Sequence, residues 1–119
     1  MGMPVPDILD PQCATRQALE RFSSKWTILV VYALCAGPQR HAELLRRIPG
    51  ITQKMLTQTL RTMESDDLVR RTVHKESHPQ HVEYSLTTLG DRLQDPLAAI
   101  CEWAARRHAD DASTVDATA

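Results

Sequence analysis

Residues 49–71 of the chain read PGITQKMLTQTLRTMESDDLVRR, and this stretch decides the fold. Pro49-Gly50 marks a turn, and Thr52 has the position and chemistry of a helix N-cap. Apolar residues then recur at helical spacing as far as about Ser65. After Leu68 the period changes to two, which is typical of a β-strand. The stretch therefore predicts a helix that begins after a tight turn and leads directly into a strand.

The two faces of this predicted helix differ in chemistry. At about 100° per residue, one arc is apolar, and the opposite arc carries hydrogen-bonding side chains and two cations without an acid. Such side chains read base edges and bind phosphates, although an ordinary solvated face could have the same composition. Taken alone, the arc leaves these two interpretations open. Its residues are Gln53, Lys54, Thr57, Gln58 and Arg61.

Three helices are predicted before this stretch. An amphipathic helix covers about residues 13–22, and a core helix follows it and ends at Gly37-Pro38. A shorter helix over about residues 41–48 ends at the turn already described. The short helix, the turn and the next helix together predict a helix-turn-helix.

A hairpin and a long helix are predicted after it. Strands over residues 69–75 and 82–86 are joined by a polar segment, and residues 75–81 would form the tip of this hairpin. The last helix runs from Thr87 or Thr88 to about Arg107 and contains Pro96, which should kink the helix or split it in two. This order predicts a mainly α winged helix-turn-helix, with a two-stranded β-hairpin wing and terminal helices.

The length of 119 residues allows one small domain. We expect it over residues 13–108, between flexible tails at 1–12 and 109–119 that lack a large apolar anchor. No apolar run approaches the length of a membrane span, and no leader opens the chain, so we expect a cytoplasmic protein without a membrane partner.

Charge is distributed unevenly along the chain. The net charge is −1, but all fourteen Lys and Arg residues lie between Arg16 and Arg107 with ten of the fifteen acids, which gives residues 13–108 a net charge of +4. The excess is local to residues 40–75, where eight basic residues face four acids. A basic surface there suits a polyanion, while a solvated face of mixed charge remains the alternative.

The three cysteines are far apart in sequence and form no CxxC pair, which argues against a disulfide framework or a zinc ribbon. Cys35 and Cys101 lie on apolar helix faces and are expected to be small buried hydrophobes. Cys13 is expected at a helix start, where exposed amides and the helix dipole lower a thiol pKa. It is either a redox sensor or a spectator, and the residues leave both open.

Metal and catalytic sites are not predicted. His74, His78 and His81 gather around the hairpin, but no cysteine or carboxylate pair completes a recognisable ligand spacing, so we expect a solvated wing. The sequence has no nucleophile elbow, phosphate-cradling glycine loop or paired carboxylates in an apolar setting. We therefore expect no enzyme activity and no cofactor.

Several short motifs follow one another between Cys13 and about His108: Lys25-Trp26-Thr27, Gly37-Pro38, Glu43-Leu44, Pro49-Gly50-Ile51, Lys54-Met55-Leu56-Thr57-Gln58, Leu68-Val69, Val82-Glu83-Tyr84-Ser85-Leu86-Thr87 and Leu89-Gly90. In this order and spacing they resemble the HxlR-type bacterial transcriptional regulators, winged-helix relatives of the MarR group. The resemblance implies a homodimer that binds a pseudo-palindromic DNA operator, usually as a repressor. It also implies that a cysteine at the place of Cys13 serves some members as a sensor of oxidants or electrophiles.

Four positions depart from the resembled pattern. His41 stands where an aromatic residue is usual, Ala14 where proline is usual, Asp67 where glycine is usual, and His81 where the wing usually has arginine. Aspartate is tolerable after the recognition helix because it can enter the left-handed region. A neutral His81 lacks the fixed charge of arginine, which puts its contact with DNA in doubt.

We expect double-stranded DNA to contact the predicted recognition helix, the residues before it and the wing tip: Arg40, His41, Thr52, Gln53, Lys54, Thr57, Gln58, Arg61, Lys75, His78 and His81. The apolar stripe of the last helix is wider than one small core needs, which with the first helix predicts a dimer interface of Leu19, Phe22, Leu93, Leu97, Ile100 and Trp103. The alternative is a winged-helix module that binds proteins and not DNA. The acid-free arc favours DNA, because a protein-docking helix would expose apolar anchors. No small-molecule effector is indicated.

Overall fold

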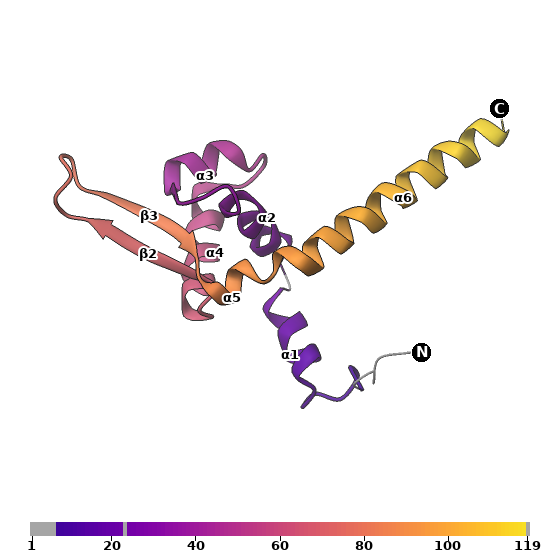
Figure 1. Ribbon diagram of the computed structural model, residues 1–119, viewed down its shortest axis with the longest axis horizontal. Helices are drawn as coiled ribbons and strands as arrows, with labels where there is room; N and C mark the ends of the chain where they lie inside the picture. Colours follow the sequence, from indigo (N-terminus) through magenta and orange to yellow (C-terminus); the bar gives the residue numbers. More distant parts are fainter. Residues whose placement is uncertain (1–6, 23, 119) are drawn as a thin grey trace.

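A helix-turn-helix followed by a β-hairpin forms the body of the protein (Figure 1). The computed structural model describes residues 7–22 and 24–118, with their side chains as far as residue 111. Figure 1 shows α6 projecting from the body on the side away from the hairpin, with α1 below the body in this view. The predicted winged helix-turn-helix is confirmed, in this order: α1 (Ala14–Arg21), α2 (Lys25–Leu34), β1 (Gln39–Arg40), α3 (His41–Arg47), α4 (Gln53–Ser65), β2 (Val69–His74), β3 (His81–Leu86), α5 (Thr88–Asp91) and α6 (Gln94–Thr118).

Hydroxyl side chains cap three of the helices, and at α4 and α5 they lie where the sequence indicated. Ser24 Oγ accepts the N–H of Trp26 at 3.2 Å at the start of α2. Thr52 Oγ1 accepts the N–H of Met55 at 3.1 Å at the start of α4, and Thr87 caps α5 in the same way. Such caps satisfy backbone donors that have no partner within the helix. They set where α4, the predicted recognition helix, begins.

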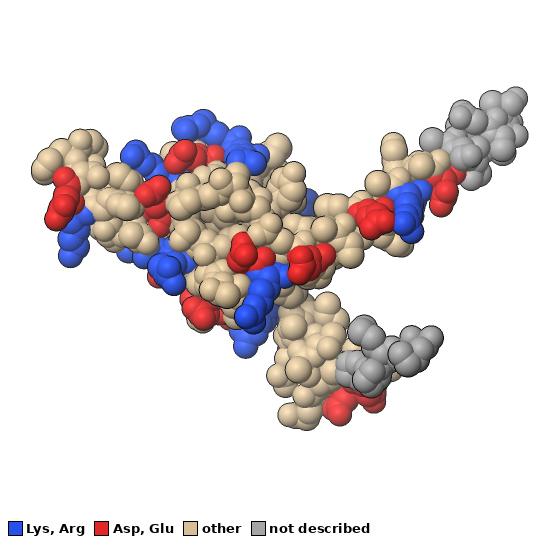
Figure 2. Space-filling model, in the orientation of Figure 1, with Lys and Arg blue, Asp and Glu red and all other residues tan. Residues whose placement is uncertain are grey.

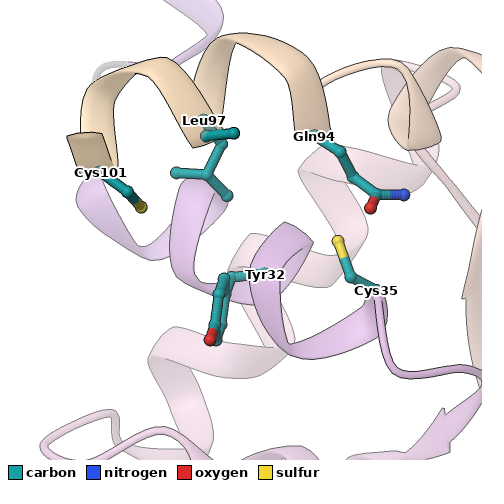
Figure 3. Close-up of a pocket in the computed structure, with 6 residues that line it drawn as sticks. Tyr32, Cys35, Gln94, Leu97 and Cys101 are labelled. Atoms are coloured by element: carbon teal, nitrogen blue, oxygen red, sulfur yellow. The ribbon is translucent and has the colours of Figure 1, made fainter.

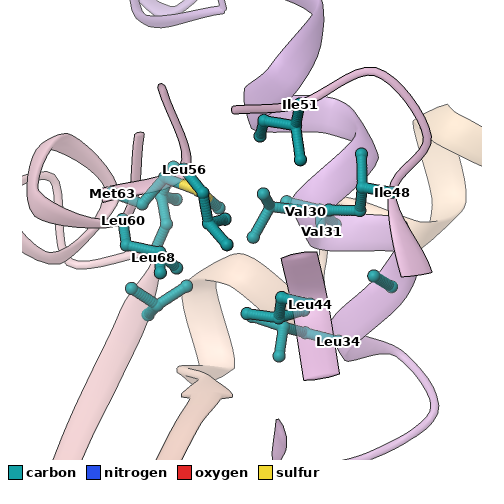
Figure 4. Close-up of a cluster of buried hydrophobic side chains, with 12 residues drawn as sticks. Val30, Val31, Leu34, Leu44, Ile48, Ile51, Leu56, Leu60, Met63 and Leu68 are labelled. Carbon is teal, nitrogen blue, oxygen red and sulfur yellow. The ribbon is translucent and has the colours of Figure 1, made fainter. Parts of the chain in front are cut away.

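The hydrophobic core lies between α2, α3 and α4 (Figure 4). In α4, Leu56, Leu60 and Met63 are almost completely buried, and they recur at the helical spacing of the predicted apolar arc. Leu44 from α3 and Val30 from α2 are fully buried against them. Because one face of α4 is held in this core, the opposite polar face is directed to solvent.

The end of α4 confirms the expected tolerance for aspartate. Asp67 has a φ of 61°, which is the left-handed conformation that the resembled family usually gives to glycine. The next N–H, from Leu68, donates to the Met63 carbonyl at 2.8 Å and closes the helix. The chain can then turn directly into β2.

The sheet has three antiparallel strands in the order β1-β3-β2, one more than the sequence predicted. The additional strand is only two residues long, so it leaves no period-two pattern to recognise. Gln39 in it is 8% exposed, and its side-chain amide donates to the backbone carbonyls of Ala33 and Gly37. In the hairpin, the last pair before the tip is His74 opposite His81.

The C-terminal helix is split as predicted, but the split falls between α5 and α6, before Pro96. Pro96 is the third residue of α6, where a backbone N–H has no intrahelical partner, so the proline is accommodated. The sequence predicted a helix end near Arg107 and a tail over 109–119; α6 instead continues to Thr118. The segment contains several alanines and neither glycine nor proline, so nothing local ends the helix.

Residues 1–6 of the expected N-terminal tail lie outside the described residues. Residues 7–12 form turns, and the Arg16 side chain ties them to α1 by donating to the Leu9 carbonyl. None of the described helices is both long enough and apolar enough to cross a membrane.

Candidate nucleic-acid interface

The outward face of α4 presents one continuous row of polar side chains. Gln53, Lys54, Gln58 and Arg61 are exposed, and Thr57 is half-buried. Together with Thr52, they line one shallow depression on the surface. The structure thus brings together the six residues that the sequence placed on the outward face or N-cap of this helix. Amide, hydroxyl and cationic groups on a single helix face are the donor set suited to the major groove.

His41 is tied to the candidate recognition helix. Its Nε2 lies 3.0 Å from the Oγ1 of Thr57, so the first residue of α3 is hydrogen-bonded to the second turn of α4. This contact holds the two helices of the motif at their crossing. The sequence placed both residues at the DNA surface, and in the structure they are half-buried and paired to each other.

Basic side chains are also exposed outside α4, at the start of α3 and at the hairpin tip. Arg40 is exposed at the N-cap of α3, where its backbone N–H donates to Glu43 Oε1 at 2.9 Å. Lys75 and His78 are exposed at the hairpin tip. Figure 2 shows Lys and Arg side chains over the helix-turn-helix and at the hairpin, with some acids among them. The body therefore offers cations on the helix-turn-helix and at the hairpin tip, which are suited to phosphate contacts.

One cluster on the hairpin contains a residue that the sequence analysis missed. His74 Nε2 lies 2.5 Å from Glu83 Oε1, and His81 Nε2 lies 3.7 Å from the same oxygen. The two imidazole rings are stacked, with centroids 4.5 Å apart. The sequence shows no cysteine or carboxylate pair at a recognisable ligand spacing from these histidines, but the strand register brings one carboxylate beside two of them. The pattern His81-x-Glu83 on one strand, with a histidine opposite, was the available signal.

Cys13 is the N-cap residue of α1 and is partly exposed. The backbone N–H of Arg16 lowers the pKa of its thiol; burial opposes this effect, and the N–H and hydroxyl of Thr15 add to it. At the other end of α1, Arg21 forms an ion pair with Asp66 at the C-cap of α4. The helix α1 and the Arg21–Asp66 ion pair therefore connect this thiol to the end of the candidate recognition helix.

The other two cysteines are exposed, so the expectation that they are buried is wrong. Partial desolvation of the sulfur and the negative charge of Asp91 raise the pKa of Cys35, the C-cap residue of α2. Cys101 is on α6, which leaves the body of the chain after its first turns. Both thiols line a pocket between α2 and α6, and Figure 3 shows them at its two ends.

The predicted dimer residues fall into two groups. Phe22 and Leu93 pack against the core, and Leu97 is half-buried in the pocket of Figure 3. The remaining three face solvent in this chain with large apolar surfaces: Leu19 is 56% exposed, Ile100 is 57% and Trp103 is 59%. These large apolar side chains on two projecting helices stay more than half exposed within the described part of the chain.

Comparison with known proteins gives the family. Residues 22–112 match the HxlR-like helix-turn-helix family. The chain belongs to that family. YkvN of Bacillus subtilis, an uncharacterized HTH-type transcriptional regulator, is 46% identical over 91 residues, which are 76% of this chain and 76% of that protein. The resemblance stated from the sequence is confirmed.

Solved structures of similar proteins share the HxlR-like fold. A putative MarR-family transcriptional regulator from Enterococcus faecalis V583 superposes with a TM-score of 0.74 at 36% identity, covering 93% of this chain and 96% of that one. The reduced form of the transcriptional regulator YodB from B. subtilis gives a TM-score of 0.71 at 33% identity, covering 78% and 91%. The same protein has also been solved after diamide treatment, with a TM-score of 0.68 at 32% identity, covering 82% and 96%.

Proposed function

We propose that this HxlR-like protein is a cytoplasmic, dimeric, sequence-specific DNA-binding transcription regulator that acts as a repressor. The observation that carries the proposal is the exposed face of α4, where Gln53, Lys54, Gln58 and Arg61 lie side by side without an acid. A recognition helix in the major groove needs this combination of amide donors, amide acceptors and cations. Membership of a helix-turn-helix family supports it.

The hairpin supplies contacts to the DNA backbone in this proposal. Arg70 and Arg71 are both exposed on β2, and Lys75 is exposed at the tip. Neighbouring residues of a strand point to opposite faces, so only one of the two arginines can face the DNA. Replacing that arginine with alanine should weaken binding to all sequences alike. The slope of log affinity against log salt concentration should become shallower by about one unit. Replacing the other should leave the slope unchanged, and equal effects of the two would contradict the proposed orientation.

Two copies of the chain are proposed to pair through α1 and α6. The exposed apolar side chains of Leu19, Ile100 and Trp103 are the reason, because burial against a second copy would remove them from water. Two recognition helices would then lie about 34 Å apart, which is one turn of DNA and matches a pseudo-palindromic operator. Sedimentation and light scattering test this directly: a stable monomer of 13.4 kDa at micromolar concentration would refute it.

The decisive experiment is a selection of bound sequences from a random DNA pool, followed by affinity measurements on the enriched site. Arg61→Ala should weaken specific binding by about 1–3 kcal/mol and relax the preference at one base position. Arg92→Ala is the matched control, since Arg92 is exposed at the end of α5, outside the α4 face. No enriched motif, or an Arg61→Ala variant with intact affinity, would favour the alternative of a protein-binding module.

Oxidation or alkylation of Cys13 is the proposed signal. The thiol is partly exposed with a lowered pKa, and α1 is linked by the Arg21–Asp66 ion pair to the end of α4. Modification that shifts α1 would change the spacing of the two recognition helices and weaken operator binding. After limiting diamide or quinone, Cys13 should be the first cysteine modified, and Cys13→Ser should keep its DNA affinity. First reaction at Cys35 or Cys101 would make Cys13 a spectator.

A further inference from the structure

We propose that His74, His81 and Glu83 form a binding site on the wing for a divalent transition-metal ion of the zinc class. Each side chain offers one ligating atom, and these atoms lie within 4.8 Å of one another. Two imidazole nitrogens and one carboxylate oxygen are a donor set suited to such ions. With three protein ligands, one coordination position stays open for water or another small ligand.

The hairpin register holds the three ligands on one face of the sheet. His74 and His81 are directly opposite each other in the last pair before the tip. Glu83 lies two residues along β3 from His81, and side chains two residues apart in a strand share a face. The ligands therefore come from two paired strands, whose backbone hydrogen bonds fix the distance between them.

The distances from Glu83 bracket those of a zinc site, and the stacked imidazole rings would rotate so that both point a nitrogen at one ion. In a tetrahedral zinc site with ligand bonds of about 2.0–2.1 Å, ligand atoms lie about 3.3 Å apart. Here the Glu83 oxygen is 2.5 Å from one imidazole nitrogen and 3.7 Å from the other. The side chains of His74, His81 and Glu83 are 39%, 19% and 29% exposed, so an ion and its water can reach them.

Metal binding would reverse the local charge of the wing. With neutral imidazoles the cluster carries the single negative charge of Glu83, and a bound dication changes this to a single positive charge. Lys75 and His78 lie between the two histidines in sequence, at the exposed tip of the same hairpin. If the wing lies against DNA, as the proposed function requires, the ion would strengthen its attraction to phosphates.

The site is tested on the DNA-free full-length chain with its three cysteines replaced by serine, so that thiols do not compete. Calorimetric titration with Zn²⁺ should show one ion per chain, and Co²⁺ should give the visible absorption of a low-symmetry site. His74→Ala and Glu83→Gln should each lower the Zn²⁺ affinity by about tenfold or more, since even residues outside the ligand set can change metal affinity that much. His78→Ala is the matched control and should change it by less than about twofold.

Three results would overturn the site: no Zn²⁺ binding by the parent chain, unchanged affinity in both ligand variants, or equal loss in His78→Ala. Circular dichroism and melting without metal establish that each variant is folded. Glu83→Gln keeps the size of the side chain, so it remains informative if His74→Ala does not fold.

The DNA consequence has a separate readout. Affinity for the selected operator should rise with Zn²⁺ relative to EDTA, and Glu83→Gln should remove the difference. Zn²⁺ binding without any change in DNA affinity would refute the coupling and leave the metal site standing. Failure of the chain to bind DNA in either condition would refute the proposed function, whereas the titration on the DNA-free protein decides the metal site alone.

Discussion

Gly90 in α5 is the position where a single added methyl group has the clearest consequence. A Cβ at this residue would lie 2.1 Å from the backbone oxygen of Leu68 and 3.3 Å from a methyl carbon of Leu86. The Leu68 oxygen is held in place, because it accepts the N–H of Thr87 at 3.1 Å. Carbon–oxygen contacts in proteins are about 3.3 Å or longer, so α5 would have to move by about 1 Å.

The size of the effect follows from what that movement breaks. It would loosen the hydrogen bond from Thr87 N–H to Leu68 and the one from Thr87 Oγ1 to the Asp67 carbonyl, which measures 2.6 Å. Each is worth about 1 kcal/mol, and overpacking adds about 1–3 kcal/mol. Helix propensity opposes these terms, since alanine is better than glycine by about 1 kcal/mol. We therefore expect Gly90→Ala to reduce the free energy of unfolding by about 2–4 kcal/mol.

Urea unfolding at one fixed protein concentration measures this change. Thr88→Ala is the control, because Thr88 is exposed in the same short helix and should change stability by no more than about 0.5 kcal/mol. Steric crowding at Gly90 lowers stability, whereas the better helix propensity of alanine raises it, so the sign of the measured change distinguishes the two effects. Unfolding of Gly90→Ala at the same urea concentration as the parent or a higher one would contradict the close approach of Gly90 to Leu68.

Three further predictions concern α4 and the thiols. Leu56→Ala should destabilise the protein by about 2–5 kcal/mol in urea unfolding because Leu56 is fully buried, and a loss below 1 kcal/mol would contradict its place in the core. Thr57→Val should cost about 1 kcal/mol, and a double-mutant cycle with His41→Ala should show coupling; additive losses would mean that the 3.0 Å contact contributes nothing. Iodoacetamide labelling of Cys13 should reach its plateau at lower pH than labelling of Cys35, because the pKa of the first thiol is lowered and that of the second is raised. Mass spectrometry of the labelled peptides measures both rates, and identical pH profiles would exclude the difference.

Periodicity and capping chemistry alone located α4 and its two faces. The N-cap at Thr52, the buried positions of Leu56 and Leu60 and the exposed polar arc were all predictable, because they depend on residues within two helical turns of one another. The left-handed residue after the helix was indicated by the family resemblance instead, because glycine is usual at the place of Asp67. A local signal also indicated the hairpin, since its strands alternate with period two.

Only the tertiary structure decided which distant residues meet. The two-residue strand β1 exists because β3 offers it an edge, and the cluster of His74, His81 and Glu83 exists because the hairpin adopts one register. A shift of one residue would turn these side chains to different faces, and the sequence alone does not state the register. Likewise, the exposure of Cys35 and Cys101 depends on the direction in which α6 leaves the body. Helix periodicity identifies an apolar face, but packing between elements determines whether anything within the chain covers it.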